Sequence, residues 1–291
     1  MKLFFLVLFI MTSFGARSQG CSDAGFCTLN SFKPAAEEPK KQLKAGMSWG
    51  RADYRIMIIS NAIEYLHPIA KNSSLDVKVT SLGQSGNGVS VYYPSDVFLN
   101  YNYAHEKWKF TLGAKLPLNR GNRKVQGFSL PLDYQSSLGT ADLIAGVSFE
   151  IKKSKWAVAI QQPITQNKNE FLPAHFVNTE LQAFTPTYRF KRKGDMLIRA
   201  SYPFSVKKLT VAPGALAIYH LGNDKYVDGN TEKEIKGSDG FTVNLAFFAD
   251  YKLNEKSSLH FNVGSPVVYR QARPDGLTRK VIMTLEYSFT F

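Results

Sequence analysis

The chain has 291 residues and a formal net charge of +13, and 44% of its residues are hydrophobic. That length allows one large β domain or two smaller domains. Beyond the first residues no apolar run approaches the roughly 20 residues that a membrane helix requires, which excludes a helical membrane protein. Many basic residues fall in turns between apolar segments, so the charge does not indicate a nucleic-acid partner.

Residues 1–18 have the pattern of a secretory signal peptide. Lys2 supplies a positive start, residues 3–10 form an apolar core, and Ala16 and Ser18 are small residues at the cleavage positions. The mature chain is predicted to begin at Gln19, outside the cytoplasm. An exported chain that spans a membrane without apolar helices must form a closed β-barrel, because open sheet edges are not tolerated in lipid.

Residues 19–41 are predicted to precede the barrel, either in the periplasm or folded back into its mouth as a plug. Cys21 and Cys27 are close in sequence, and an oxidising compartment favours a small disulfide loop between them. The open alternative is lipidation of Cys21. Two cysteines alone do not predict a metal site, and no cofactor is expected.

From residue 42 to residue 291, apolar and polar residues alternate with the period of two that is typical of a strand. Short turns near residues 72, 105, 153, 207 and 255 alternate with longer connections near 90, 128, 180, 230 and 271. Outer-membrane barrels have short periplasmic turns and longer outer loops. The pattern therefore predicts an all-β, transmembrane, antiparallel up-and-down barrel of about twelve strands, with residues 84–94 and 187–191 in outer loops.

The closing segment, residues 281–291, has the clearest alternation. Its apolar face consists of Val281, Met283, Leu285, Tyr287, Phe289 and Phe291. A full strand that ends on Phe resembles the closing strand of a bacterial outer-membrane β-barrel. The resemblance implies that Tyr287, Phe289 and Phe291 form the signal read by the barrel-assembly machinery, and that the protein lies in the outer membrane of a Gram-negative cell.

Charged residues fall on the opposite strand faces, which are the predicted lumen. Lys115, Arg199 and Glu286 each lie between lipid-facing neighbours, and a charge in contact with lipid is costly, so they are the predicted pore-lining residues. The open alternative is that they only join strands through ion pairs. The mixed signs of the lumen charges predict no strongly selective ring, and the strand number predicts a narrow or plugged pore.

Catalytic motifs were sought around the histidines. Outer-membrane phospholipases resemble this chain in size and strand number, but they carry a His and a Ser two residues apart on one strand. The residues two positions after the five histidines are Ile69, Lys107, Val177, Gly222 and Asn262, so this arrangement is absent. We predict that the chain is not an enzyme, although a serine from elsewhere in the fold stays open. His260 is expected to be a hydrogen-bonded residue of the lumen.

Two further loop regions carry charge. Residues 224–234 match a calcium loop in part, but Tyr226 and Ile235 occupy ligand positions, which favours an exposed charged loop. A second group lies in two predicted outer loops and comprises Arg120, Arg123 and Lys124, with Arg189, Lys191, Arg192 and Lys193. Arginine binds phosphate well, so we expect contact with lipopolysaccharide there as well as with membrane lipid.

The whole-chain pattern from residue 43 to residue 291 resembles the outer-membrane transport barrels grouped around the phenol meta-pathway family and the long-chain fatty-acid transporters. The resemblance rests on length, strand spacing and the closing strand, and the asparagine-proline-alanine plug signature of the fatty-acid branch is missing. It implies a passive channel or transporter for small molecules, hydrophobic ones among them. The alternatives are a pore-free structural or surface-interaction barrel and, less favoured, a lipid-hydrolysing enzyme. The sequence assigns no role to the distinctive segments 134–139 and 161–163.

Overall fold

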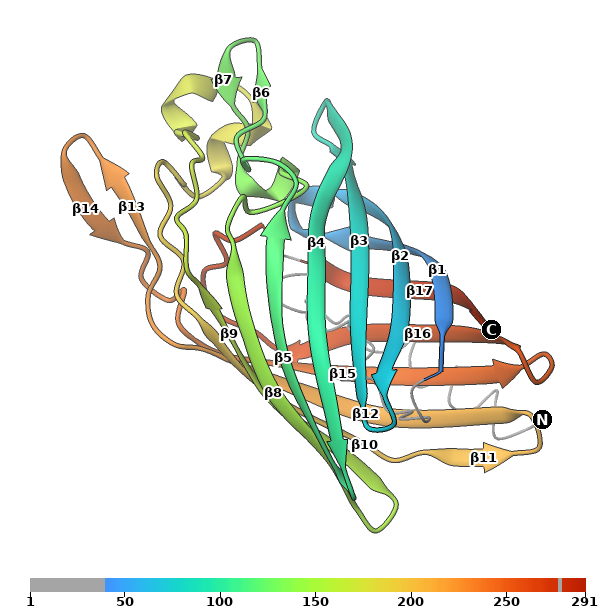
Figure 1. The fold of residues 1–291 in the computed structure, drawn as a ribbon. Coiled ribbons are helices and arrows are strands. Elements are labelled where there is room, and N and C mark those ends of the chain that lie inside the picture. The colour runs from blue at the N-terminus through green and yellow to red at the C-terminus, as the bar shows by residue number, and fades with distance from the viewer. Residues whose placement is uncertain (1–39, 277–278) are drawn as a thin grey trace.

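The computed structural model describes residues 40–276 and 279–291, and within them twelve long strands close a single antiparallel barrel (Figure 1). The predicted signal peptide, Cys21 and Cys27 lie outside the described residues. The barrel strands are β1 (Gln42–Ala52), β2 (Met57–Ala70), β3 (Ser73–Gly86), β4 (Val89–His105), β5 (Trp108–Pro117), β8 (Asp142–Ile151), β9 (Ser154–Pro163), β10 (Asp195–Ser201), β12 (Leu209–His220), β15 (Gly240–Lys252), β16 (Ser257–Val268) and β17 (Arg279–Thr290).

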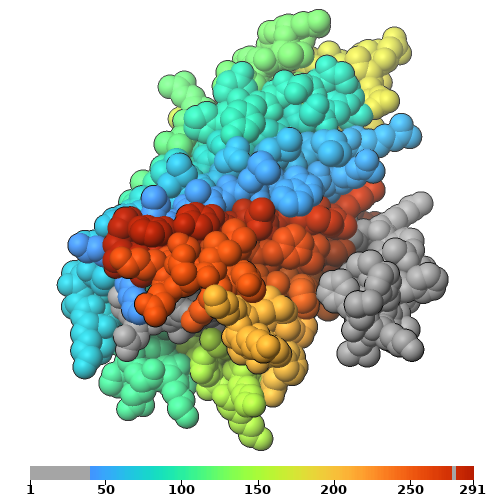
Figure 2. Space-filling view, turned by 90° about the vertical axis from the view of Figure 1, so that its right-hand side faces the viewer, coloured from blue at the N-terminus to red at the C-terminus, as the bar shows by residue number. Residues whose placement is uncertain are grey.

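Each barrel strand pairs with the next one along the chain, and the closing strand β17 pairs with β1. Leu43 lies opposite Phe289 in this last pair, so the two ends of the barrel domain meet at one seam. Figure 2 shows the red C-terminal strands against the blue N-terminal ones at this seam. The short strand β11 (Phe204–Val206) adds to the edge of β12 beyond the end of β10. The predicted fold class, including the strand number, is confirmed.

One end of the barrel, the turn end, has only tight connections. The strands on either side of the connections 106–107, 152–153 and 207–208 pair up to the turn itself. Glu106, Lys152 and Lys207 have positive φ of 52°, 57° and 55°. Two-residue hairpin turns require positive φ, which costs a residue other than Gly about 1–2 kcal/mol. Both ends of the barrel domain lie here too, since the Phe291 amide donates to the Lys41 carbonyl at 3.0 Å.

The opposite end, the loop end, carries most of the irregular structure. Its connections contain the hairpins β6 (Lys124–Val125) with β7 (Phe128–Ser129) and β13 (Lys225–Asp228) with β14 (Thr231–Glu234). They also contain the 3-10 turns η3 (Asp53–Arg55), η4 (Leu132–Tyr134), η5 (Pro173–Phe176) and η6 (Glu180–Ala183). Figure 1 shows both hairpins projecting beyond the barrel wall. No helix in the described ranges is long and apolar enough to cross a membrane.

Residues 84–94 are not the loop that the sequence predicts. β3 and β4 stay paired up to Gly86 and Val89 and turn at Asn87 and Gly88, which have φ of 52° and 75°. Gly83, just before this region, has a packing reason, because a Cβ there would lie 2.7 Å from the Tyr92 ring. As predicted, residues 187–191 lie in a connection rather than in a barrel strand.

The outer face of the barrel is apolar and exposed, as a lipid-facing surface must be. Leu112 and Leu245 point outward, with 64% and 55% of their surface exposed. At the turn end, Trp108, Phe149 and Trp156 share one register row across β5, β8 and β9. The rings of Trp108 and Phe149 are 4.9 Å apart. Aromatic rows at strand ends are typical of the interfacial girdles of membrane barrels.

The inner face is divided into two strips. An apolar strip crosses β4 to β12 and consists of Phe98, Ile144, Ala157, Ala159, Leu197, Leu216 and Ile218. The wall on β1, β2, β3 and β17 is charged instead, with buried Lys44, Glu64, Asp76, Lys78 and Glu286. Glycines on neighbouring strands leave room for long polar side chains. A Cβ on Gly46 would lie 2.6 Å from Glu286 Cγ, and one on Gly113 would lie 2.1 Å from Asn100 Oδ1. Glu286 and Asn100 therefore lie along the barrel wall.

Candidate functional site: the inner segment and the loop network

The connection between β5 and β8 contains a buried run. Every residue from Ser129 to Leu138 is buried, although none belongs to a barrel strand. Connections normally run over a protein surface, because a buried loop must find partners for all its backbone polar groups. We call residues 129–142 the inner segment, and its contacts show where it lies.

Side chains from the inner face of the barrel bind this segment. Gln84 Nε2 on β3 donates to the Gln135 carbonyl at 2.8 Å, and Ser137 Oγ donates to Asp96 Oδ1 on β4 at 2.6 Å. Gln135 Nε2 in turn donates to the Leu130 carbonyl at 3.0 Å. Gln84 and Asp96 alternate with outward-facing residues and so point into the barrel. The inner segment therefore lies inside the barrel mouth at the loop end.

Tyr134 fixes the middle of the inner segment to the tip of the β3–β4 hairpin. Its hydroxyl donates to the Gly86 carbonyl at 2.8 Å and accepts from Asn87 Nδ2 at 3.0 Å. Burial raises the pKa of Tyr134 to about 12. The phenol therefore stays neutral and keeps its hydrogen bond at any physiological pH.

The connection 164–194 packs over the inner segment. Phe171, Phe176, Leu181 and Phe184 form an apolar cluster with Leu130, Tyr134 and the inward-facing Ile58 and Leu82. Asn169 is the polar centre of this contact. Its Nδ2 donates to the Gly121 and Leu130 carbonyls, both at 3.0 Å, and its Oδ1 accepts from the Phe171 amide at 2.9 Å and from Thr187 Oγ1 at 2.7 Å. The two connections therefore form one packed unit in the mouth.

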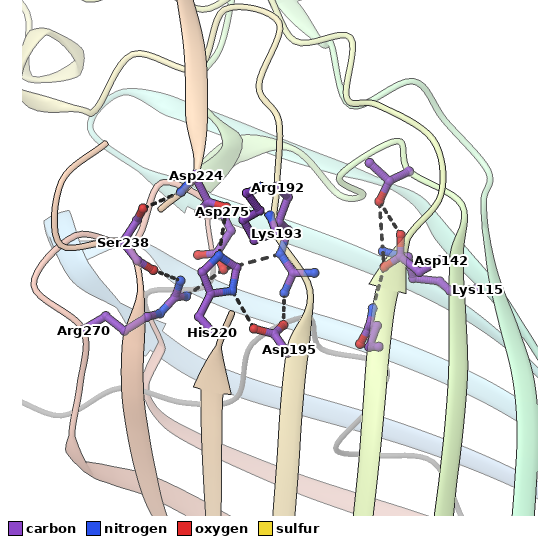
Figure 3. Close-up of polar contacts among 12 residues, drawn as sticks. Lys115, Asp142, Arg192, Lys193, Asp195, His220, Asp224, Ser238, Arg270 and Asp275 are labelled. Carbon is purple, nitrogen blue, oxygen red and sulfur yellow. Dashed lines mark hydrogen bonds and ion pairs between the residues drawn. The ribbon is translucent and has the colours of Figure 1, made fainter. Parts of the chain in front are cut away.

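An ion pair anchors the base of the inner segment. Lys115 on β5 and Asp142 on β8 are register partners, and Lys115 Nζ lies 2.9 Å from Asp142 Oδ2 with neither side chain exposed (Figure 3). Thr140 Oγ1 donates to Asp142 Oδ1 at 2.7 Å, and Gln161 Nε2 donates to Oδ2 at 2.5 Å. Gln161 belongs to the 161–163 segment whose role the sequence left open. Here it helps to satisfy a buried carboxylate.

A second polar cluster, the loop network, joins three other connections at the same end. Asp195 begins β10 and His220 ends β12, and His220 Nδ1 lies 2.6 Å from Asp195 Oδ1. His220 Nε2 lies 2.8 Å from Asp224 Oδ1 (Figure 3). Both ring nitrogens of an imidazole can donate only when the ring is protonated. Two flanking carboxylates therefore favour a cationic His220.

Two arginines extend the loop network toward the β16–β17 connection. Arg192 pairs with Asp195, and its Nε lies 3.8 Å from Asp275 Oδ2. Arg270 donates to Asp275 at 2.8 Å and to the Ser238 carbonyl at 2.6 Å. Burial alone would raise the pKa of Asp275, but Arg270 and Arg192 outweigh it and hold this pKa well below its usual range. The loop network thus links the connections that contain Arg192, Asp224 and Asp275.

Two sequence-based predictions about these loops are wrong. Asp224 was expected in an exposed charged loop, but it is buried beside His220, and the exposed part of this region is 228–234 in the β13–β14 hairpin. Arg192 was expected to face lipopolysaccharide, but it is buried between Asp195 and Asp275. Each residue has one partner close in the sequence, Asp195 for Arg192 and His220 for Asp224. The rest of the network, Asp275 and Ser238, comes from other connections, so local sequence does not reveal that these residues are buried.

The remaining predicted loop cations lie near the surface. Arg123 stacks on the Tyr93 ring at 3.4 Å, Lys124 pairs with Glu170 at 2.6 Å, and Lys191 pairs with Glu232. Arg120, Arg189 and Lys193 are exposed. Contact with lipopolysaccharide stays a prediction for these residues. Within the described ranges, no group of three His, Cys, Asp or Glu side chains could hold a metal ion.

The three predicted pore-lining residues all face inward and are buried, but they lie apart on β5, β10 and β17. Lys115 belongs to the ion pair described above. The Arg199 guanidinium lies 5.9 Å from the centroid of the Phe248 ring, and Glu286 lies over Gly46. Whether they line a conducting path stays a prediction.

The predicted assembly signal lies at the turn end of β17. Tyr287 and Phe291 are exposed on the outer face, and the Tyr287 hydroxyl lies 2.9 Å from Ser257 Oγ. The Phe289 and Phe291 rings meet edge to face at 5.2 Å. These contacts leave the aromatic face available, and its role in assembly stays a prediction.

Sequence reasoning missed the inner segment altogether. A signal was present in its composition: Gln135, Ser136 and Ser137 are small or uncharged polar residues between apolar ones, and Asn167 and Asn169 follow in the next connection. Such side chains can satisfy buried backbone groups without the cost of burying a charge. That signal alone does not say which surface the segment meets.

No protein-family model and no curated protein matches the chain. Among solved structures, the COG4313 outer membrane channel from Pseudomonas putida F1 aligns with a TM-score of 0.60 at 13% identity, over 93% of this chain and 100% of that one. The chain has the fold of an outer-membrane β-barrel.

Two more distant structures are also similar in outline. The NanC porin aligns at a TM-score of 0.47 and 8% identity, over 86% of this chain and 100% of that one. The outer membrane phospholipase A from Escherichia coli aligns at 0.39 and 11%, over 93% and 94% of the two chains. The NanC and phospholipase likenesses are too weak to inform function. The likeness to the P. putida channel establishes the fold alone.

Proposed function

We propose that this protein is an outer-membrane channel for small solutes whose loop-end mouth is gated by the inner segment. The observation that carries the proposal is the buried run Ser129–Leu138. Side chains of the inner wall hold it inside the mouth through hydrogen bonds, and it does not pair with the barrel strands. Such a segment can move without breaking any pairing between barrel strands, although Ser129 itself pairs with Lys124 in the β6–β7 hairpin. A gate needs this property, whereas a purely structural barrel does not.

The side chains of the inner wall are suited to the passage of small, partly hydrophobic solutes. The apolar strip from Phe98 to Ile218 faces the interior on five strands. Arg199 interrupts it between Ala157 and Leu216, so an apolar group meets mainly apolar side chains on that side. The opposite wall presents Lys44, Glu64 and Lys78, which can retain water or bind the polar end of a solute. The P. putida structure of the same fold is named a channel, which agrees with this proposal.

Single-channel recording in planar bilayers tests the proposal. The parent barrel should conduct weakly or in rare openings, and replacing residues 129–138 with a short Gly-Ser linker should raise conductance or open probability several-fold. The matched control replaces residues 228–231, the exposed tip of the β13–β14 hairpin, which projects from the loop end and should leave conductance unchanged. Flux of a small aromatic solute into vesicles, compared with a charged solute of equal size, tests the apolar strip.

The second candidate is a pore-free structural barrel. It is favoured by the Lys115–Asp142 pair, which is fully buried and joins two strands of the wall. If neither the parent nor the linker variant conducts, the channel proposal fails and this second candidate replaces it.

A further inference from the structure

Asp250, His260 and Ser288 form a hydrogen-bonded chain across three adjacent strands, β15, β16 and β17. His260 Nδ1 lies 2.6 Å from Asp250 Oδ1, and His260 Nε2 lies 2.8 Å from Ser288 Oγ. Asp250 and His260 are register partners, and Ser288 lies two residues beyond the partner of His260 on β17. All three sit near the turn end, where the β15–β16 hairpin brings Asp250 to His260 and the pairing of β16 with β17 brings Ser288 beside them.

His220 and His260 differ in the partners of their ring nitrogens. His220 lies between two carboxylates, which favours a cation with no free lone pair. His260 lies between one carboxylate and one hydroxyl. Its Nδ1–H can donate to Asp250 while the Nε2 lone pair accepts the Ser288 proton, so His260 can act as a general base. This order, carboxylate to Nδ1 and serine to Nε2, is the one that activates a serine nucleophile.

We propose that Ser288 is the nucleophile of a hydrolytic site on the inner face of the barrel, with small carboxylic esters as its substrates. Ser288 Oγ attacks the ester carbonyl carbon while its proton passes to His260 Nε2. The tetrahedral intermediate collapses, the alkoxide leaves with that proton as the free alcohol, and an acyl-Ser288 remains. A water molecule, deprotonated by His260, then attacks the acyl carbon and releases the carboxylic acid, which restores Ser288.

The surroundings of the chain supply further parts of such a site. Lys44 faces the interior as the register partner of Ser288 on β1, and an ammonium there can stabilise the oxyanion that forms on the carbonyl. The Asp250 and His260 side chains are 26% and 20% exposed, so the base is open to solvent. Ser288 Oγ has a longer alternative acceptor, the Ser258 carbonyl at 3.4 Å, which competes only weakly with His260.

The site is separate from the proposed gate. It lies at the turn end, while the inner segment and the loop network lie at the loop end, so its activity can be measured whether or not the barrel conducts. The charged groups near the His260 imidazole come from three other strands. They are Asp250 and Lys252 on β15, Glu286 on β17 and Lys44 on β1. His260 and Ser288 lie on different strands, so the site does not depend on a His and a Ser two residues apart on one strand.

A fluorophosphonate probe tests the proposal on the full folded barrel in detergent. The probe loses fluoride to a serine nucleophile, and mass spectrometry should place the phosphonyl group on Ser288. Ser288→Ala should abolish labelling, and His260→Gln should slow it by roughly a hundredfold or more. Hydrolysis of p-nitrophenyl acetate should show the same losses.

Ser48→Ala is the matched control, since Ser48 also faces the interior but its hydroxyl bonds Thr284 Oγ1 at 2.8 Å and no histidine. It should leave the labelling rate unchanged. Heat-modifiable migration on a gel confirms that each variant is folded, and the parent result stands even where a variant fails to fold. Absence of an adduct at Ser288, or equal labelling of the parent and His260→Gln, would overturn the proposal.

Discussion

Lys115 Nζ lies 2.9 Å from Asp142 Oδ2 in a place where neither side chain reaches solvent. A buried ion pair returns its desolvation cost only if the remaining polar atoms also find partners, and here Thr140 and Gln161 complete the carboxylate. The pair holds β5 to β8 directly below the inner segment. This geometry favours the alternative that the sequence left open, in which Lys115 joins strands.

Removing one member of this pair should destabilise the barrel. Lys115→Met leaves Asp142 as an uncompensated buried charge and should lower the free energy of unfolding by roughly 3–5 kcal/mol, measured by urea denaturation in vesicles. Lys107→Met, in an exposed turn, should change it by no more than about 0.5 kcal/mol. Unfolding curves that coincide for the parent and Lys115→Met would show that the pair does not stabilise the barrel. A change in reversal potential without loss of stability would instead assign Lys115 to a pore.

The register of the strands makes a second prediction. Leu112 and Leu245 point outward near the middle of β5 and β15, so arginine at either site should destabilise the barrel by roughly 2–4 kcal/mol if both lie at mid-bilayer. Leu112→Phe keeps an apolar side chain at the same site and should be tolerated. Urea unfolding in vesicles measures the difference, and an arginine variant as stable as its phenylalanine counterpart would place these residues outside the lipid-facing band.

The closing strand makes a third prediction. Changing Tyr287, Phe289 and Phe291 to Ser removes the aromatic face at the turn end of β17, and we expect the chain to fail to insert, as judged by loss of heat-modifiable barrel in outer-membrane fractions. Thr290→Ser lies on the same strand outside that face and serves as the control. Normal insertion of the triple serine variant would refute a role of these residues in assembly.

The loop network predicts a response to acid. The Asp275 pKa is held below its ordinary value of 3.8, so Asp275 stabilises the folded loops above that pH, and this contribution is lost as the pH falls through the lowered pKa. Pepsin should therefore begin to cut the connections 221–239 and 269–276 only well below about pH 4. Asp275→Asn should make the same loops sensitive to trypsin at pH 7, because Arg270 and Arg192 lose a shared partner. The exposed Asp239→Asn should resemble the parent.

The surface cations make a fifth prediction. Arg120 and Arg189 are exposed at the loop end and can bind phosphate, so changing both to Gln should weaken binding of purified lipopolysaccharide by several-fold in a pull-down at physiological salt. Arg192→Gln should disturb the loop network instead and appear as loop cleavage by trypsin. Equal lipopolysaccharide binding by the parent and the Arg120–Arg189 double variant would contradict the predicted contact.

The sequence by itself determined which residues face lipid wherever one face is apolar and the other polar. The alternation of Leu112 with Thr111, and of Leu285 with Glu286, fixes the two faces because a strand has a period of two. The same rule failed for residues 209–219. The apolar strip places Leu216 and Ile218 inside the barrel, so both faces of that strand are apolar and the period carries no information.

Only the tertiary structure decided how the connections and the inward polar residues are used. The inner segment is buried because β3 and β4 present Gln84 and Asp96 to it. Arg192 is buried between the neighbouring Asp195 and Asp275, which lies far along the chain. Asp250, His260 and Ser288 meet because the register of β15, β16 and β17 sets which side chains lie beside one another, and the sequence pattern does not specify that register. Local patterns determine whether a side chain points inward or outward, but the register of the closed barrel determines which side chains it contacts.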